Sequence, residues 1–132
     1  MPQIDVVDET WIAAPPHRVA ARVADPDSWR RWWPTLELVV DELRAAEGVR
    51  WFVRGPATGS MEVWLEPDLD GVRVHYFVRL DPPDGRRLSP RRAQRAVLTH
   101  RRHAKRVFWA IKDELEGDSA ARRNAAAVTS RP

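Results

Sequence analysis

The stretch APPHRVAARVADPDSWRRWWP, residues 14–34, decides how the rest of the chain can be arranged. The paired prolines near its start suit the first turn of a helix, and the apolar spacing that follows predicts a short helix over residues 17–24. Asp25 or Asp27 can then accept hydrogen bonds from the free amides of a second helix, as its N-cap. That second helix must also be short, because Pro34 disfavours helical geometry in the residue before it.

Five strands are expected around these two helices. One precedes them and four follow; the expected ranges are residues 4–12, 35–43, 48–55, 59–67 and 71–80. Apolar and polar side chains alternate most regularly in the last strand, which predicts one buried and one exposed face. The links between the last four strands are short, and short links favour antiparallel hairpins.

A long amphipathic helix is expected after the strands. Ser89 is its expected N-cap, Pro90 is its first residue, and the pattern ends near Gly117. Its apolar face consists of Ala93, Val97, His100, Ala104, Val107, Phe108, Ile111 and Leu115. The domain is expected to span residues 1–117. Residues 118–132 are expected to form a disordered tail, because they carry no periodic apolar pattern.

The order of these elements predicts an α+β domain, in which a curved antiparallel sheet of about five strands wraps around the long helix. A length of 132 residues suits one domain. The chain has no cysteine, no apolar run long enough to span a membrane and no signal pattern at its N-terminus. These features together predict a cytoplasmic protein.

The chain resembles the helix-grip superfamily, also called SRPBCC, which joins START lipid-transfer domains, polyketide cyclases/dehydrases and the birch-pollen-allergen fold. The resemblance rests on residues 14–34, on the hairpin WLEPDLDGVRVHYFVR (64–79) and on the closing helix AKRVFWAIKDELEG (104–117). It implies that a polyketide-, aromatic- or lipid-like ligand binds between the sheet and the long helix. Members commonly have six or seven strands, so a sheet of five predicts a cavity that is smaller or open at one edge.

His100 is the candidate catalytic residue. It interrupts the apolar face of the long helix, where it could hydrogen-bond a ligand or move a proton near neutral pH. The alternative is a core histidine that is hydrogen-bonded to a strand residue such as Tyr76. The expected ligand-binding residues are Trp32, Trp33, Trp51, Met61, Tyr76, Val78, Val97, His100 and Ala104. The clustered tryptophans could equally do no more than fill the core.

Other chemistry finds little support in the sequence. Asp8 and Glu42 lie on the apolar sides of their expected strands and could act as bases, although exposure at a strand end explains both more simply. The four histidines lack metal-ligand spacing, and the chain has neither a phosphate-binding glycine loop nor a G-x-S-x-G motif. We therefore expect no metal and no cofactor, and the sequence leaves open whether the protein is an enzyme.

The charge of the chain is divided unevenly along its length. Residues 1–85 hold 15 acidic and 9 basic side chains, a net charge of −6, whereas residues 86–112 hold ten basic side chains and no acidic one. A basic block suggests nucleic acid or an anionic membrane as a partner. However, these basic residues recur along one side of the expected long helix, and that spacing is also typical of a solvated helix face. Leu98 and Trp109 share the basic side. The alternatives to a polyketide cyclase-like protein are therefore a lipid carrier and an interaction protein that uses this basic face.

Overall fold

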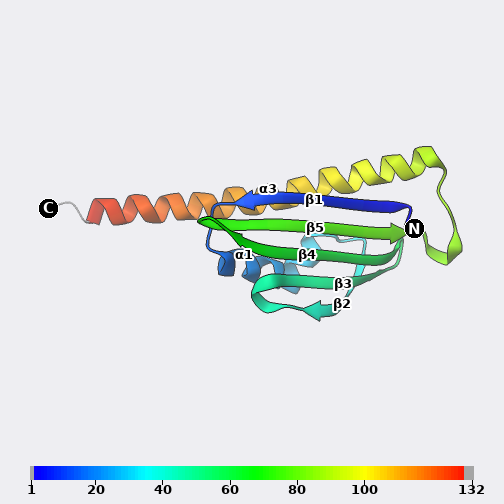
Figure 1. Ribbon diagram of the computed structural model, residues 1–132, viewed down its shortest axis with the longest axis horizontal. Coiled ribbons are helices and arrows are strands. Elements are labelled where there is room, and N and C mark those ends of the chain that lie inside the picture. Colours follow the sequence, from blue (N-terminus) through cyan, green and yellow to red (C-terminus); the bar gives the residue numbers. More distant parts are fainter. Residues whose placement is uncertain (1, 130–132) are drawn as a thin grey trace.

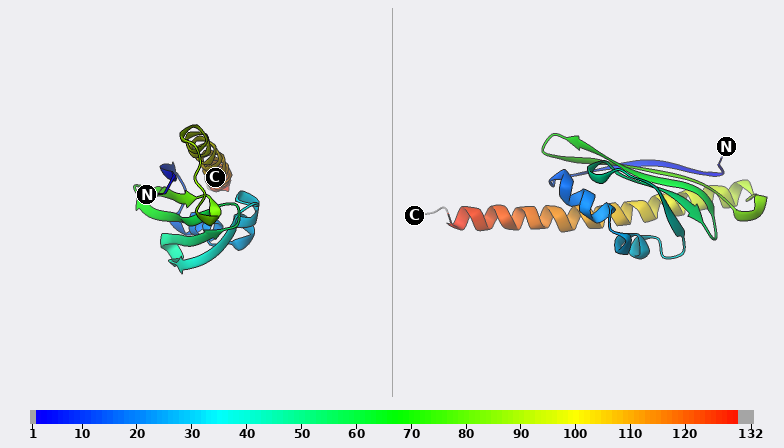
Figure 2. Two further views of the ribbon diagram at one scale, coloured as in Figure 1. Left: turned by 90° about the vertical axis from the view of Figure 1, so that its right-hand side faces the viewer. Right: turned by 90° about the horizontal axis from the view of Figure 1, so that it is seen from below.

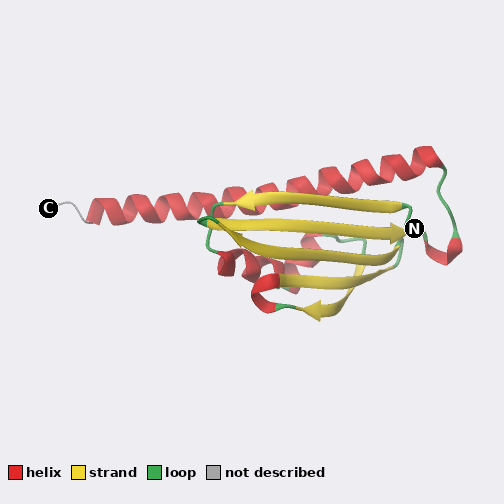
Figure 3. Ribbon diagram, viewed as in Figure 1, coloured by secondary structure: helices red, strands yellow, loops and turns green. Residues whose placement is uncertain are grey.

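The computed structural model describes residues 2–129 of the chain, with the side chains of residues 2–117 (Figures 1 and 3). Its strands and α-helices, in chain order, are β1 (Ile4–Ile12), α1 (Pro16–Val23), α2 (Pro26–Trp32), β2 (Glu37–Leu43), β3 (Gly48–Arg54), β4 (Thr58–Asp68), β5 (Gly71–Asp81) and α3 (Pro90–Thr129). Short 3₁₀ turns lie at Ala45–Glu47 and Pro83–Gly85. This is the predicted order of elements.

The five strands form one antiparallel sheet in the order β1-β5-β4-β3-β2. Strands β2 to β5 are joined by successive hairpins. The last of them, β5, pairs with the first strand, β1, along the whole length of β1. Figure 2 shows all three helices on the same side of the curved sheet. The predicted fold class, a curved five-stranded sheet on a long helix with two short helices after the first strand, is confirmed.

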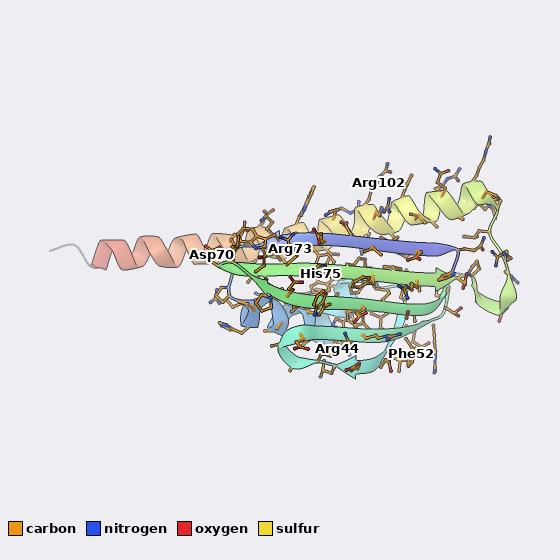
Figure 4. All side chains as sticks on the ribbon, in the orientation of Figure 1. Arg44, Phe52, Asp70, Arg73, His75 and Arg102 are labelled. Atoms are coloured by element: carbon orange, nitrogen blue, oxygen red, sulfur yellow. The ribbon has the colours of Figure 1, made fainter. Side chains whose placement is uncertain are left out.

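The alternation in β5 determines which face of the sheet meets the helices. Val72, Val74, Tyr76, Val78 and Leu80 are all buried. The residues between them lie on the outer face, where His75 is hydrogen-bonded to Glu66 (3.2 Å) and Arg73 is paired with Asp68 (2.6 Å; Figure 4). The core therefore lies between one face of the sheet and the helices, as the alternation predicts.

The link between α2 and β2 brings a group of tryptophans under the sheet. Asp25 caps α2 by accepting a hydrogen bond from the Asp27 amide at 2.9 Å, as predicted. The Trp29 indole donates to the Val23 carbonyl at 2.5 Å, which ties α2 to the end of α1. Strand β2 begins at Glu37, two residues later than predicted, because the Leu36 amide bonds to the Trp33 carbonyl (3.2 Å) in a turn around Pro34.

Helix α3 begins as predicted but extends further than predicted. It starts at Pro90, and the Ser89 hydroxyl accepts a hydrogen bond from the Arg92 amide at 3.3 Å. The expected end near Gly117 is wrong, because the helix continues to Thr129. Residues 118–129 contain five alanines, and alanine is the best helix former. Gly117 does not stop the helix, because a glycine in a helix interior costs only about 1 kcal/mol. The division into a domain of residues 1–117 and a tail stays a prediction, and residues 130–132 lie outside the described residues.

Only part of the apolar face of α3 is buried. Ala104, Val107, Phe108, Ile111 and Leu115 are packed in the core. Val97, which we expected to be buried, is only half-buried. The expectation failed because Val97 packs only against the margin of the core, where its neighbours Ala96, Thr99 and His100 line two open pockets.

Two lysines attach the middle of α3 to the edge strand β1. The Lys105 ammonium donates to the Glu9 carbonyl at 2.9 Å, and the Lys112 ammonium donates to the Trp11 carbonyl at 2.8 Å. Both carbonyls belong to β1, which is an edge strand of the sheet formed by the described residues. The side chains of α3 thus satisfy backbone groups that a neighbouring strand would otherwise bond.

Candidate ligand-binding site

An aromatic cluster centred on Trp33 fills the space between the sheet and the short helices. The Trp33 ring is stacked on Tyr76, with centroids 5.9 Å apart and planes inclined by 6°. Trp51 and Trp32 each meet Trp33 edge-on at 5.6 Å. These are the offset and edge-to-face geometries that aromatic pairs prefer. The cluster places Trp33 between the pocket described below and the core.

Three polar groups in this cluster are buried without a hydrogen-bond partner among the described residues. They are Nε1 of Trp33, Nε1 of Trp51 and the hydroxyl of Tyr76. A buried polar group left unpaired costs about 1–3 kcal/mol. Burial raises the pKa of Tyr76 well above its ordinary value of 10.0, and the neighbouring Trp33 opposes that rise in part. The Tyr76 hydroxyl therefore stays protonated and can donate a hydrogen bond.

A pocket of about 380 Å³ lies between the end of α2, the turn from β3 to β4 and the first half of α3. We call it the histidine pocket. It is lined by Ile4, Trp32, Trp33, Pro34, Thr35, Leu36, Pro56, Ala57, Thr99, His100 and His103. A second pocket, of about 460 Å³, lies on the other side of Trp33 and of the turn that follows it. Trp33, Pro34 and Leu36 are thus the wall between the two pockets.

The two histidines of the pocket differ in their bonding. Nε2 of His103 donates to the Trp32 carbonyl, and because a carbonyl only accepts, this contact fixes the hydrogen on Nε2. The His100 imidazole has no hydrogen bond to any other group of residues 2–117. Burial, and then the charge of His103, lower the pKa of His100 below its ordinary value of 6.5. The imidazole of His100 is therefore neutral at pH 7 and free to accept or donate.

Comparison with solved structures identifies the architecture around this pocket. The Aha1 dimer from Colwellia psychrerythraea is similar over 86% of this chain and 96% of its own, with 14% identity and a TM-score of 0.58. Ara h 8.0201 is similar over 86% and 97%, with 14% identity and a TM-score of 0.58. TTHA0849 from Thermus thermophilus is similar over 87% and 99%, with 15% identity and a TM-score of 0.56.

The protein has the helix-grip fold. The predicted resemblance to START and birch-pollen-allergen-type proteins is thereby confirmed for the architecture. No family model and no curated protein matches the sequence. At identities of 14–15% the likeness establishes the fold alone, and the chemistry must be argued from the residues of this chain.

The residues predicted to bind ligand are divided between the pocket and the core of this helix-grip protein. Trp32, Trp33 and His100 come together in the histidine pocket. The other predicted residues do not line it: the fully buried ones are Trp51, Met61, Tyr76, Val78 and Ala104, and the half-buried one is Val97. Trp51 and Tyr76 nevertheless touch the Trp33 ring from its core side. That any of them binds a ligand stays a prediction.

Sequence reasoning missed His103, Thr99 and the β3–β4 turn as parts of the pocket. His103 could have been found, because it lies three residues after His100 and so on the same side of a helix. The turn residues Pro56 and Ala57 carry no such local signal, since only the pairing of β3 with β4 brings them opposite α3.

The two carboxylates considered as bases are held outside the histidine pocket. Asp8 faces α3 and forms an ion pair with Lys105 at 3.0 Å. Glu42 is exposed and pairs with Arg44 at 3.1 Å. A bulge between Val40 and Glu42 breaks the alternation of β2, which is why the sequence pattern placed Glu42 on the apolar side. The only titratable groups lining the pocket, among residues 2–117, are the two histidines.

Two structural features are absent from the described part of the chain. No group of histidine and carboxylate side chains there is arranged to hold a metal ion. No helix there is both long and apolar enough to cross a membrane.

Proposed function

We propose that this protein binds a small hydrophobic molecule that carries a hydrogen-bond acceptor, and that the histidine pocket is its entry and binding site. The single observation that carries the proposal is the unpaired imidazole of His100 in a mostly apolar pocket, beside an aromatic cluster that holds three buried polar atoms without a partner among the described residues. A mostly apolar pocket with a few polar groups to fix orientation is the usual composition of a small-molecule site.

The ligand class follows from the walls of the pocket and from its one unpaired imidazole. Trp33 and Leu36 provide apolar contact, and the His100 imidazole can donate to a carbonyl or hydroxyl oxygen. A polyketide-, aromatic- or lipid-like molecule with an oxygen at one end fits this arrangement. The fold that this protein shares with START and birch-pollen-allergen-type proteins supports the same class. A cytoplasmic location stays a prediction.

A polyketide cyclase/dehydrase-like reaction would require a base in the pocket that can take a proton from the ligand. A ligand with an acidic C–H bond beside a carbonyl would give its proton to neutral His100, and the enolate oxygen would need a hydrogen-bond donor beside it. Within residues 2–117, no carboxylate lines the histidine pocket to assist His100. We therefore propose binding as the primary role and enolisation as a second step that rests on it.

The test uses two probes that differ by one hydroxyl group, 2-naphthol and naphthalene. Both should quench tryptophan fluorescence in the wild-type protein, because Trp32 and Trp33 line the pocket. His100→Phe should weaken 2-naphthol by about 1–3 kcal/mol, roughly 5- to 150-fold, and leave naphthalene unchanged. If the reaction occurs, the same change should lower its rate more than it lowers binding.

The matched control is His17→Phe, which changes an exposed histidine of α1 outside the pocket. It should bind both probes as the wild type does. If His100→Phe binds 2-naphthol as tightly as the wild type, His100 is only a packing residue and the proposed polar recognition is wrong. Native mass spectrometry of freshly purified protein would then show whether any apolar ligand accompanies the chain.

A further inference from the structure

A groove separate from the histidine pocket runs between α3 and the edge strand β1. It has a volume of about 680 Å³, and we call it the basic groove. Its lining consists of Val7, Asp8, Arg101, Arg102, Lys105, Arg106 and Trp109. Asp8, its one acid, is neutralised by Lys105 at 3.0 Å. The groove therefore presents three arginines and an indole ring without a competing carboxylate.

The arginines of the basic groove have no ion-pair partner within residues 2–117. Arg101, Arg102 and Arg106 are all exposed, and α3 contains no acid between Pro90 and Lys112 to pair with them. Figure 4 shows Arg102 pointing away from the sheet. This contrasts with Arg22, Arg44 and Arg73 elsewhere, each of which is paired with a carboxylate. Unpaired guanidinium groups suit phosphate, which they can bind in a bidentate manner.

Trp109 supplies a second, independent kind of contact. Its side chain is 55% exposed, although a ring of this size is usually mostly buried. The Lys105 ammonium lies 6.0 Å from the centroid of the ring. An exposed indole beside arginines can stack on a nucleobase while the arginines contact the backbone. An anionic membrane fits less well, because it requires an apolar helix face and that face of α3 is packed against the core.

We propose that the basic groove binds single-stranded nucleic acid, with Arg101, Arg102 and Arg106 contacting phosphates and Trp109 stacking on a base. This function is independent of the ligand proposed for the histidine pocket, because the two sites share no lining residue. Such binding depends on the charge of the phosphate backbone and is largely independent of the nucleotide sequence.

The experiment measures fluorescence anisotropy of a 5′-labelled 20-nucleotide oligo-dT and of its oligo-U counterpart, between 50 and 200 mM salt. The wild-type protein should bind saturably. The triple variant Arg101→Gln, Arg102→Gln, Arg106→Gln should bind at least about tenfold more weakly, and its slope of log K against log salt should be shallower by about 2, for three lost phosphate contacts. Trp109→Ala should lose about 5- to 150-fold with the salt slope unchanged, because it removes stacking and no charge.

The matched control removes the same charge from three exposed arginines away from the groove, as Arg54→Gln, Arg79→Gln, Arg86→Gln. It should change affinity less than about twofold at 150 mM salt, where the Debye length is about 8 Å. If the control and the groove variant lose the same affinity for the oligonucleotide, binding depends only on the net charge of the protein, and the proposal is wrong. Absence of oligonucleotide binding at 50 mM salt would also overturn the proposal, including the case in which the protein binds vesicles with 30% phosphatidylserine instead. All variants change exposed side chains, and their melting temperatures check that they fold.

Discussion

Gly48, at the start of β3, is the clearest case of a single residue that the fold requires. Its φ of +114° lies where side chains are rarely tolerated, and an added Cβ would lie 1.9 Å from the Val63 carbonyl oxygen of β4. Gly85 has a comparable φ of +69°, but no atom lies within 4 Å of its added Cβ. Gly48 is therefore required both by its backbone conformation and by the close approach of β4, whereas Gly85 is required by its backbone conformation alone.

We predict that Gly48→Ala lowers the free energy of unfolding by more than about 3 kcal/mol, because the backbone of β4 must move. Gly85→Ala should cost only about 1–2 kcal/mol, the usual penalty for a side chain in the left-handed region. Urea unfolding of the two variants compares them directly. Similar losses in both would mean that the β3–β4 contact yields easily.

His100 should make stability depend on pH. Its pKa is lowered in the folded protein by burial and then by His103, from an ordinary value of 6.5. The unfolded chain therefore takes up a proton at a higher pH than the folded chain does. Its contribution to stability is present above pH 6.5 and is lost as the pH falls through the lower folded pKa.

We predict that the free energy of unfolding of the wild type falls more steeply below pH 6.5 than that of His100→Gln. Urea unfolding between pH 5 and 7.5 measures the difference, and an NMR titration of the His100 ring measures the folded pKa. Parallel stability profiles for the two proteins would show that His100 is as well solvated in the fold as in the unfolded chain.

At the scale of elements, α3 has two faces with opposite demands. Between Ala104 and Leu115, one side of α3 buries apolar side chains against the sheet, while the other side carries exposed arginines. A charge placed on the first face loses its water without gaining a partner, and a charge placed on the second keeps its water.

We predict that Val107→Asp destabilises the protein by several kcal/mol, because the carboxylate would be buried and unpaired. Arg102→Asp, on the exposed side, should change stability by less than about 0.5 kcal/mol. Thermal melting of both variants tests the assignment of the two faces. Equal melting temperatures would contradict it.

Periodicity predicted these faces because it is a local property of the sequence. The buried residues of β5 and of the middle of α3 follow directly from periods of 2 and 3.6. The bulge in β2 and the burial of Val97 could not be predicted in this way, because both depend on neighbours distant in sequence. The end of α3 was missed for another reason: helix propensity, rather than an apolar face, extends it beyond Gly117.

At the scale of the whole molecule, the sheet and the helices meet over a solid aromatic cluster rather than a large empty interior. Trp51 and Tyr76 were predicted to line a cavity, and they lie behind Trp33, fully buried. The sequence could indicate aromatic residues and a histidine near one another. It could not indicate where space remains, because that depends on how α2, α3 and the β3–β4 turn pack together.

The far end of α3 should contribute little to the stability of this assembly. In Figure 1 its orange-to-red end extends past the sheet. Glu116, which accepts a hydrogen bond from the Ala13 amide at 2.9 Å, is the last side chain seen to bond to β1 or its following loop. We predict that deleting residues 118–132 changes the free energy of unfolding by less than about 1 kcal/mol. Urea unfolding measures this, and a larger loss would show that the segment packs on the domain.

The attachment of α3 to β1 has a consequence for colloidal behaviour. Lys105 and Lys112 occupy carbonyls on the outer edge of β1, so that edge cannot readily template an intermolecular sheet. Within residues 2–117 no side chain bonds to the backbone of β2, the opposite edge, which also exposes Val39, Val40 and Leu43. If concentrated protein forms β-rich aggregates, growth should therefore begin at β2.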